Sequence, residues 1–162
     1  MPQERLTNIK LLITDVDGVL TDGGIYITEN GDELKKFNAK DGRGIIDLGK
    51  TGFKVGIISH SANVKLIKSR AKRMRVPLVY AGDEDKLVIL KQWCDELDIR
   101  LKDVAFIGDD TNDLRVMSEV GVIACPADAH RSVKSIAHII LERKGGEGCV
   151  REFIDDYLLP AL

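Results

Sequence analysis

The chain has 162 residues, which suits one compact domain, and its 44% of hydrophobic residues are enough for an ordinary core. Lys and Arg (24) nearly balance Asp and Glu (26), so the net charge of −2 gives no electrostatic basis for binding nucleic acid or an anionic membrane. No apolar run approaches the roughly 20 residues of a membrane helix, and residues 1–8 lack the apolar stretch of a signal peptide. Three scattered cysteines indicate neither a disulfide framework nor a zinc site, so we expect a reduced, cytoplasmic protein.

Strand-like and helix-like segments alternate along the chain. Short, nearly continuous apolar runs predict strands at 9–14, 53–59, 78–80, 104–107 and 122–125. Apolar residues at helical spacing predict helices around 64–74, 87–97, 114–120 and 148–159. This alternation predicts an α/β fold with a Rossmann-like, doubly wound parallel sheet. In such a sheet, ligands bind beyond the carboxyl ends of the strands.

One segment interrupts the alternation. Residues 25–28 and 33–37 are strand-like, and the turn between them contains Asn30-Gly31. This dipeptide is typical of a tight β-hairpin turn. We therefore expect a hairpin, spanning about 23–38, directly after the first strand.

Two aspartates end the first predicted strand, in the stretch DVDGVLTDG (15–23). Asp15 can attack phosphorus as a carboxylate nucleophile, and Asp17 can protonate the leaving oxygen and later activate water. Paired carboxylates at the mouth of a sheet also suit a hard cation. The alternative is an acidic surface turn. If these two aspartates stood alone in the sequence, that alternative would be the better explanation, because the pattern is short and common.

Three further stretches follow predicted strands in the same way. Ser59 ends the second strand, Lys86 opens a helix after the third, and GDDTND (108–113) follows the fourth. Taken alone, each has an ordinary explanation as a turn serine, a solvated lysine or an acidic helix start. Because the carboxyl ends of parallel strands share one edge of the sheet, we expect all these groups to converge there.

Together these four stretches resemble the haloacid dehalogenase superfamily. The resemblance implies phosphatase activity, with Asp15 as nucleophile, Asp17 as acid and base, and Ser59 and Lys86 at the phosphoryl group. It implies Mg²⁺ held by Asp15, the carbonyl of Asp17 and Asp109, with two further acids supporting that site, Asp110 and Asp113.

Many members of this superfamily carry a cap domain, whereas this chain offers only the hairpin. The stretches GGIYITENGDELKKFNAKDGRGI (23–45) and ERKGGEGCVREF (142–153) resemble a capless branch acting on 8-phosphates or 9-phosphates of eight- and nine-carbon ulosonic acids. The resemblance covers about residues 9–158 and implies a phosphorylated sugar acid as substrate. It also implies a homotetramer, in which the hairpin of one subunit shapes the pocket of the next.

The same resemblance implies substrate contacts from Thr21, Gly42, His60, Ser61, Arg70, Arg73 and Lys86. A guanidinium suits a sugar carboxylate, although a solvated basic helix explains the arginines equally well. The tail, about 143–162, could fold over the pocket through Gly145-Gly146, or these glycines could simply end a strand. The triplet Ser59-His60-Ser61 departs from the branch's usual Thr-Gly-Arg or Thr-Gly-Glu, which leaves the choice between eight and nine carbons open, with a slight preference for nine.

Two other functions fit parts of the pattern. A catalytically idle tetramerisation or regulatory module of a sialate or CMP-sugar pathway would share the fold, but both Asp15 and Asp17 are present here. A receiver domain also uses a phosphorylated aspartate, but its acceptor follows a middle strand. The pathway served, whether lipopolysaccharide, capsule or sialylated glycan, stays open at this point.

Overall fold

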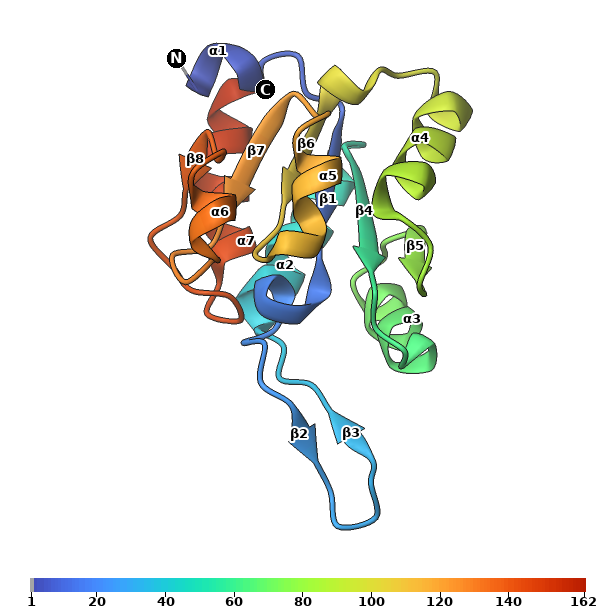
Figure 1. The fold of residues 1–162 in the computed structure, drawn as a ribbon. Helices are drawn as coiled ribbons and strands as arrows, with labels where there is room; N and C mark the ends of the chain where they lie inside the picture. The colour runs from blue at the N-terminus through green and yellow to red at the C-terminus, as the bar shows by residue number, and fades with distance from the viewer. Residues whose placement is uncertain (1) are drawn as a thin grey trace.

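The computed structural model describes residues 2–162. Its centre is a six-stranded parallel sheet with the strand order β5-β4-β1-β6-β7-β8 (Figure 1). The strands are β1 (Leu11–Thr14), β4 (Lys54–Ser59), β5 (Leu78–Ala81), β6 (Val104–Ile107), β7 (Val122–Cys125) and β8 (Ile139–Ile140). The five predicted strands all form, and the α/β class with a doubly wound parallel sheet is confirmed. The sixth strand has only two residues, too few for an apolar run to reveal it.

Helices cover both faces of the sheet (Figure 1). The longer ones are α2 (Ala39–Lys50), α3 (Val64–Arg73) and α4 (Lys86–Leu97), and the shorter ones α1 (Pro2–Leu6), α5 (Leu114–Met117), α6 (Arg131–Lys134) and α7 (Cys149–Glu152). Single turns of other helix types occur at Val16–Leu20, Leu101–Asp103, Thr111–Asp113, Phe153–Leu158 and Leu159–Ala161. No helix within residues 2–162 has the length and apolar character needed to cross a membrane.

The sheet separates two aliphatic cores. Successive residues of β1 point to opposite faces, as the pleat requires. Leu12 joins a cluster that includes Ile45 of α2 and Ile67 of α3. Leu11 and Ile13 join the other cluster, which includes residues of α4 and α5. Burial on both faces explains why the strands are apolar almost without interruption.

Helix α2 was not predicted from the sequence. Three glycines within it lower its intrinsic helix propensity. Two of them are closely packed by arginine side chains, because a Cβ at Gly42 would lie 2.7 Å from Arg70 Nη2 and one at Gly44 would lie 2.6 Å from Arg151 Cδ. Tertiary contacts therefore decide this helix. The helix predicted over 114–120 is also shorter than expected and ends at Met117.

The predicted hairpin is confirmed. Strands β2 (Tyr26–Ile27) and β3 (Glu33–Leu34) pair antiparallel and project away from the carboxyl edge of the sheet (Figure 1). Gly31 has φ of 84° in the turn, a conformation that glycine adopts readily. At its base the hairpin is joined by a bridge between Thr21 and Phe37. Within residues 2–162 no cap domain covers the sheet.

Helix α2 fixes the C-terminal segment through Asp41. This carboxyl group is buried, and its Oδ1 accepts a hydrogen bond of 2.8 Å from the backbone N–H of Arg151. Its Oδ2 has no hydrogen-bond partner among the described residues. Burial raises the pKa of Asp41 from 3.8 to about 6, although the N–H groups of Arg151 and Val150 and the charge of Arg143 oppose the shift.

The raised pKa of Asp41 makes stability depend on pH. The folded state holds this proton more tightly than the unfolded state, so stability falls as pH rises from about 4 to about 6. The wild type should lose up to about 3 kcal/mol of unfolding free energy over this window. We expect D41N to keep most of it, because the asparagine side chain carries no charge at either pH. Urea unfolding at a series of pH values measures the difference. The matched control is D32N, at an exposed aspartate of the hairpin turn, and parallel curves for D41N and the wild type would contradict the prediction.

Candidate active site

The loop after β1 places Asp15 at the carboxyl edge of the sheet. The Asp15 backbone N–H continues the sheet by donating to the carbonyl of Ile107 at 3.0 Å. The Asp15 side chain is 6% exposed, and its Oδ1 accepts from Val16 N at 2.6 Å. Gly18, with φ of 82°, then turns the chain. A Cβ at Gly18 would lie 1.9 Å from Asp109 Oδ2, so only glycine lets these two loops approach.

Lys86 lies between two carboxylates from different loops. It opens α4, its side chain is 1% exposed, and its Nζ lies 2.8 Å from Asp15 Oδ2 and 2.7 Å from Asp113 Oδ1. Asp113 is completely buried, and its Oδ2 accepts from the backbone N–H of Asp109 at 3.1 Å. The loops after β1, β5 and β6 thus meet at one point, at the carboxyl edge of the sheet, as the order of the strands predicts.

The cluster contains more acid than base. Burial raises the pKa of Asp15 well above its ordinary value, and Asp113 adds to this while Lys86 opposes it. The pKa of Asp109 is raised to about 7, first by burial and then by Asp113 and Asp110. Burial lowers the pKa of Lys86, but Asp15 and Asp113 outweigh it and the net shift is upward. One ammonium group therefore faces three carboxylates.

This excess of negative charge fits a divalent cation. Oxygens of Asp15, Asp109 and Asp113 lie within 4.8 Å of one another. Both oxygens of Asp113 are already hydrogen-bonded, whereas the carboxylate of Asp109 accepts no hydrogen bond from the described residues. An all-oxygen donor set of this kind suits Mg²⁺. Both oxygens of Asp15 also have partners, Val16 N and Lys86 Nζ, so Asp109 is the acid of this group whose side chain is free to bind the ion.

A polar cavity opens beside these acids. Its volume is about 230 Å³, and it is lined by Asp15, Asp17, Gly18, Gly23, Asp109, Asp110 and Asn112. A more apolar cavity of about 310 Å³ lies at the other end of β4 and β5, next to Lys54 and Leu78. Because no acidic residue lines that second cavity, the polar one is the candidate active site.

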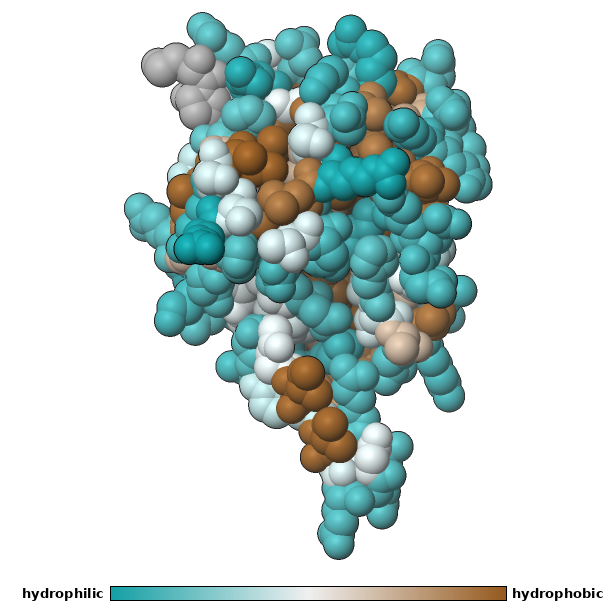
Figure 2. All heavy atoms as spheres, in the orientation of Figure 1, coloured by the Kyte–Doolittle hydropathy of each residue, from teal (hydrophilic) through white to brown (hydrophobic). Residues whose placement is uncertain are grey.

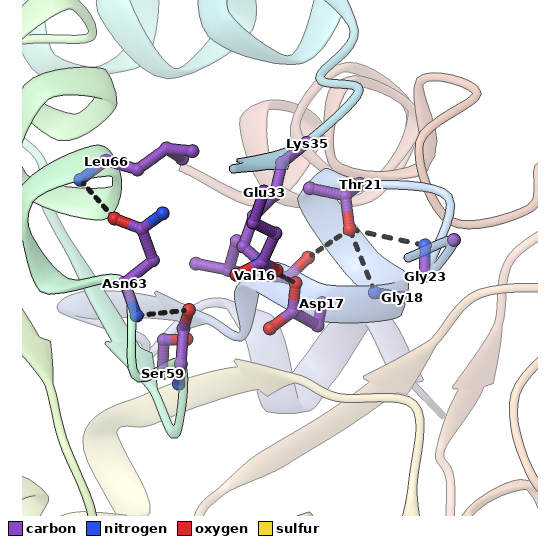
Figure 3. A network of polar contacts seen from close by, with 12 residues as sticks. Val16, Asp17, Gly18, Thr21, Gly23, Glu33, Lys35, Ser59, Asn63 and Leu66 are labelled. Atoms are coloured by element: carbon purple, nitrogen blue, oxygen red, sulfur yellow. Dashed lines mark hydrogen bonds and ion pairs between the residues drawn. The ribbon is translucent and has the colours of Figure 1, made fainter. Parts of the chain in front are cut away.

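Asp17 is hydrogen-bonded to the hairpin. Lys35, just after β3, donates to Asp17 Oδ1 at 2.6 Å and to Glu33 Oε1 at 2.7 Å (Figure 3). The side chain of Lys35 is 6% exposed although it lies at the base of a projecting hairpin. Lys35 is not among the residues predicted from the sequence, because one lysine in a charged stretch carries no signal of burial.

The hydroxyl of Thr21 organises the loop after β1. It donates to the carbonyl of Val16 at 3.3 Å and accepts from the backbone N–H groups of Gly18 and Gly23, each at 3.2 Å (Figure 3). Thr21 is also buried. Its hydroxyl therefore already has three partners in the loop that holds Asp17.

The triplet Ser59-His60-Ser61 stands at the end of β4, and its His60 lies next to a residue that lines the cavity. Ser59 is buried, and its Oγ accepts from the backbone N–H of Ser61 at 3.0 Å. His60 is exposed, and its Nε2 lies 2.9 Å from the carbonyl oxygen of Glu84, so Nε2 carries the proton and donates. Its Nδ1 lies 3.5 Å from Nδ2 of Asn112, a residue that lines the cavity.

The remaining predicted residues are spread more widely. Arg70 is half-buried, stacks over the ring of Phe37 at 5.2 Å, and has its guanidinium against Gly42. Arg73 is exposed on α3. Asp110 is exposed, and its Oδ1 accepts from Thr111 N at 2.7 Å, capping a short helical turn. The structure thus brings Arg70 and Gly42 together at the hairpin base but leaves Arg73 on the surface.

The glycine pair in the C-terminal tail packs on the loop after β1. The backbone N–H of Gly146 donates to the carbonyl of Val19 at 3.0 Å, and Asn38 Nδ2 donates to the carbonyl of Gly146 at 3.2 Å. A Cβ at Gly145 would lie 1.9 Å from the carbonyl oxygen of Gly18. The tail of this same chain therefore supports the loop that holds Asp17.

Comparisons with known proteins agree with this geometry. The model of the haloacid dehalogenase-like hydrolase family matches residues 57–154. A curated relative, the 3-deoxy-D-manno-octulosonate 8-phosphate phosphatase KdsC of Yersinia pestis, is 43% identical over 96% of this chain and 83% of its own. The crystal structure of that enzyme from Yersinia pestis superposes with a TM-score of 0.93 at 42% identity, over 98% of this chain and 85% of the other.

A second similar protein was crystallised with ligands. The 3-deoxy-D-manno-octulosonate 8-phosphate phosphatase of Moraxella catarrhalis, in complex with magnesium, phosphate and KDO, has a TM-score of 0.93 at 32% identity, over 99% of this chain and 91% of that one. The chain belongs to the haloacid dehalogenase-like hydrolase family. The resemblance inferred from the sequence and the phosphatase class are both confirmed.

Removing Lys86 would leave two buried carboxylates without their cation. We expect K86M to lower the unfolding free energy by about 3 kcal/mol in the presence of EDTA, because uncompensated buried charge is costly. Chemical denaturation measures the loss. The control is K91M, at an exposed lysine of the same helix, and equal stability of the two variants would contradict the prediction. The double variant K86M/D113N should recover part of the loss.

Proposed function

We propose that this chain is a Mg²⁺-dependent phosphomonoesterase that works through a phosphorylated Asp15. The proposal rests on one observation: Lys86, the likewise buried Asp15 and the acids of the β6 loop converge beside a polar cavity. Asp15 is held by Val16 N and Lys86, so a nucleophile with few accessible rotamers faces that cavity. Positioning of this kind supplies much of the catalysis in phosphoryl transfer.

In the proposed reaction Asp15 takes up and releases the phosphoryl group, and Asp17 gives up and regains a proton. An oxygen of Asp15 attacks phosphorus, the bond from phosphorus to the ester oxygen breaks, and the proton of Asp17 passes to that oxygen. Water then attacks the aspartyl phosphate and gives a proton to Asp17. Inorganic phosphate leaves, and the carboxylate of Asp15 is restored. Lys86 neutralises charge throughout, and the hydroxyl of Ser59 is proposed to contact the phosphoryl group.

Magnesium would be bound by the carboxylates of Asp15 and Asp109 and the carbonyl of Asp17, with Asp110 and Asp113 supporting. When bound, it supplies positive charge beside the phosphoryl oxygens. Two observations support the fit: the crowding of these acids and the Asp109 carboxylate without a hydrogen bond from the described residues.

The proposed substrate is a 3-deoxy-2-ulosonic acid phosphate. The similar enzymes of Yersinia pestis and Moraxella catarrhalis bear the name of the 8-phosphate of the eight-carbon acid, which favours that substrate over a nine-carbon 9-phosphate such as that of KDN or N-acylneuraminate. Arg70, half-buried beside Phe37 and Gly42, is the candidate partner of the sugar carboxylate, with Thr21, His60, Ser61 and Arg73 as further candidates. We place the enzyme in lipopolysaccharide synthesis in the cytoplasm, where its three buried thiols would stay reduced.

A panel of phosphate esters tests the substrate. With Mg²⁺, we expect kcat/KM for 3-deoxy-D-manno-octulosonate 8-phosphate to exceed that for glucose 6-phosphate by roughly 100-fold or more, because a pocket built to pair a carboxylate discriminates strongly. N-acylneuraminate 9-phosphate should fall between them. Equal efficiency across the panel would contradict the specificity, while leaving the phosphatase chemistry intact.

The chemistry has its own controls. D15N should lose more than about 1000-fold in kcat, since it removes the attacking group. EDTA should abolish turnover, and added Mg²⁺ should restore it. D95N, at an exposed acid of α4 away from the cavity, is the control and should keep nearly all of the wild-type activity. Undiminished turnover by D15N would overturn the mechanism. A wild type without turnover would instead favour the catalytically idle module.

We also propose that residues 1–162 act as one domain that assembles into a homotetramer through the hairpin. Ile25, Tyr26, Ile27 and Leu34 expose 79%, 42%, 67% and 57% of their surface on this short element. Figure 2 shows large apolar side chains gathered on the projecting hairpin, on a surface that is otherwise largely polar. Exposed apolar groups on a projecting hairpin are typical of an interface. Packing against other subunits would also bring a neighbour's hairpin toward each open cavity.

The oligomeric state is measurable by light scattering coupled to size exclusion. We expect the wild type to be a tetramer and I25E/I27E to dissociate, because burying two carboxylates in an apolar interface is unfavourable. V88E is the control, since Val88 is 48% exposed on α4, away from the hairpin. A wild type that elutes as a monomer would contradict the assembly.

A further inference from the structure

We propose that Lys35 is a positioning residue that aims Asp17 at the leaving oxygen and so couples the hairpin to the chemical step. This inference rests on the proposed phosphatase function. Two lysines among the described residues, Lys86 and Lys35, have nearly buried side chains that contact an aspartate lining the cavity, yet the proposed mechanism uses only Lys86.

The contact of Lys35 with Asp17 is close and specific. Lys35 Nζ lies 2.6 Å from Asp17 Oδ1, and the side chain of Asp17 is 45% exposed while that of Lys35 is 6% exposed. Among the described residues, Lys35 is the one side chain that hydrogen-bonds this carboxylate. A half-exposed aspartate would otherwise sample several rotamers. The buried lysine therefore restricts the direction of Asp17.

Neighbouring groups hold Lys35 itself in place. Glu33 Oε1 accepts from its Nζ at 2.7 Å, so two carboxylates use two of its three N–H donors (Figure 3). The bridge between Thr21 and Phe37 ties the hairpin base, two residues further on, to the loop that holds Asp17. The ammonium group is thus fixed relative to that loop from both sides.

This arrangement distinguishes the two oxygens of Asp17. Oδ1 accepts from Lys35. A neutral carboxylic acid keeps an acceptor oxygen besides its O–H, so Oδ1 can stay bonded to Lys35 while Oδ2 carries the proton. Oδ2 is then the oxygen that gives the proton to the ester oxygen and later takes one from water. Lys35 acts by orientation and does not contact the reacting phosphorus.

Leaving groups of different basicity test this role. An alkyl alkoxide needs a proton as it departs, whereas p-nitrophenolate leaves without one. For K35M we expect kcat/KM to fall roughly 10- to 100-fold with the best alkyl phosphate of the panel, and by less than about 3-fold with p-nitrophenyl phosphate. K36M is the matched control, because Lys36 is adjacent but exposed, and it should match the wild type on both esters.

A merely structural lysine would behave differently. Equal losses by K35M on both esters, or no loss on either, would overturn the role of Lys35. Thermal melting checks that K35M is folded, and K35Q, which keeps a shorter N–H donor, replaces it if K35M unfolds. A wild type that hydrolyses neither ester would overturn the phosphatase function and this role with it. If the wild type is active, the phosphatase function stands, and the comparison of K35M with the wild type then tests the role of Lys35 alone.

Discussion

The structure depends on one buried ion cluster, in which Lys86 bridges Asp15 and Asp113. Buried charges are costly unless they are paired, so this lysine is what allows two carboxylates to lie inside the protein. The same cluster joins the loops after β1, β5 and β6, which are far apart in the sequence. The same residues therefore serve the fold and the site, because the groups that attract a cation and a phosphoryl group also hold the carboxyl edge of the sheet together.

Much of this could be predicted from local patterns. Apolar runs such as 104–107 reveal strands, because a strand that is buried on both faces needs apolar residues throughout. The order of the strands then places Asp15, Lys86 and Asp109 at one edge of the sheet. Helix α2 could not be predicted, because its glycines lower the helix propensity of the segment. Gly42 and Gly44 pack against Arg70 and Arg151, which are distant in the sequence. Lys35 could not be predicted for the same reason, since its hydrogen bond is to Asp17, 18 residues away in the chain.

The glycines at the site show why sequence spacing alone is incomplete. Gly18 turns the chain after Asp17, and it also lies where a Cβ would collide with Asp109. Gly145, more than a hundred residues further along the chain, fits against the Gly18 carbonyl oxygen. Three segments that are distant in the sequence therefore pack around Gly18, Asp109 with its side chain and Gly145 with its backbone. A local pattern indicates the turn at Gly18, whereas the close packing becomes visible only in three dimensions.

The hairpin has a double role that follows from strand alternation. Lys35 and Phe37 are two residues apart, so in extended chain they point to the same side, while Lys36 between them points to solvent. Lys35 contacts Asp17, and Phe37 lies under Arg70, the candidate partner of the sugar carboxylate. One short segment thus contacts the proposed acid and the proposed specificity residue together. If subunits pack through the exposed face of the hairpin, assembly would fix both contacts at once, because the segment cannot shift at one of them without shifting at the other.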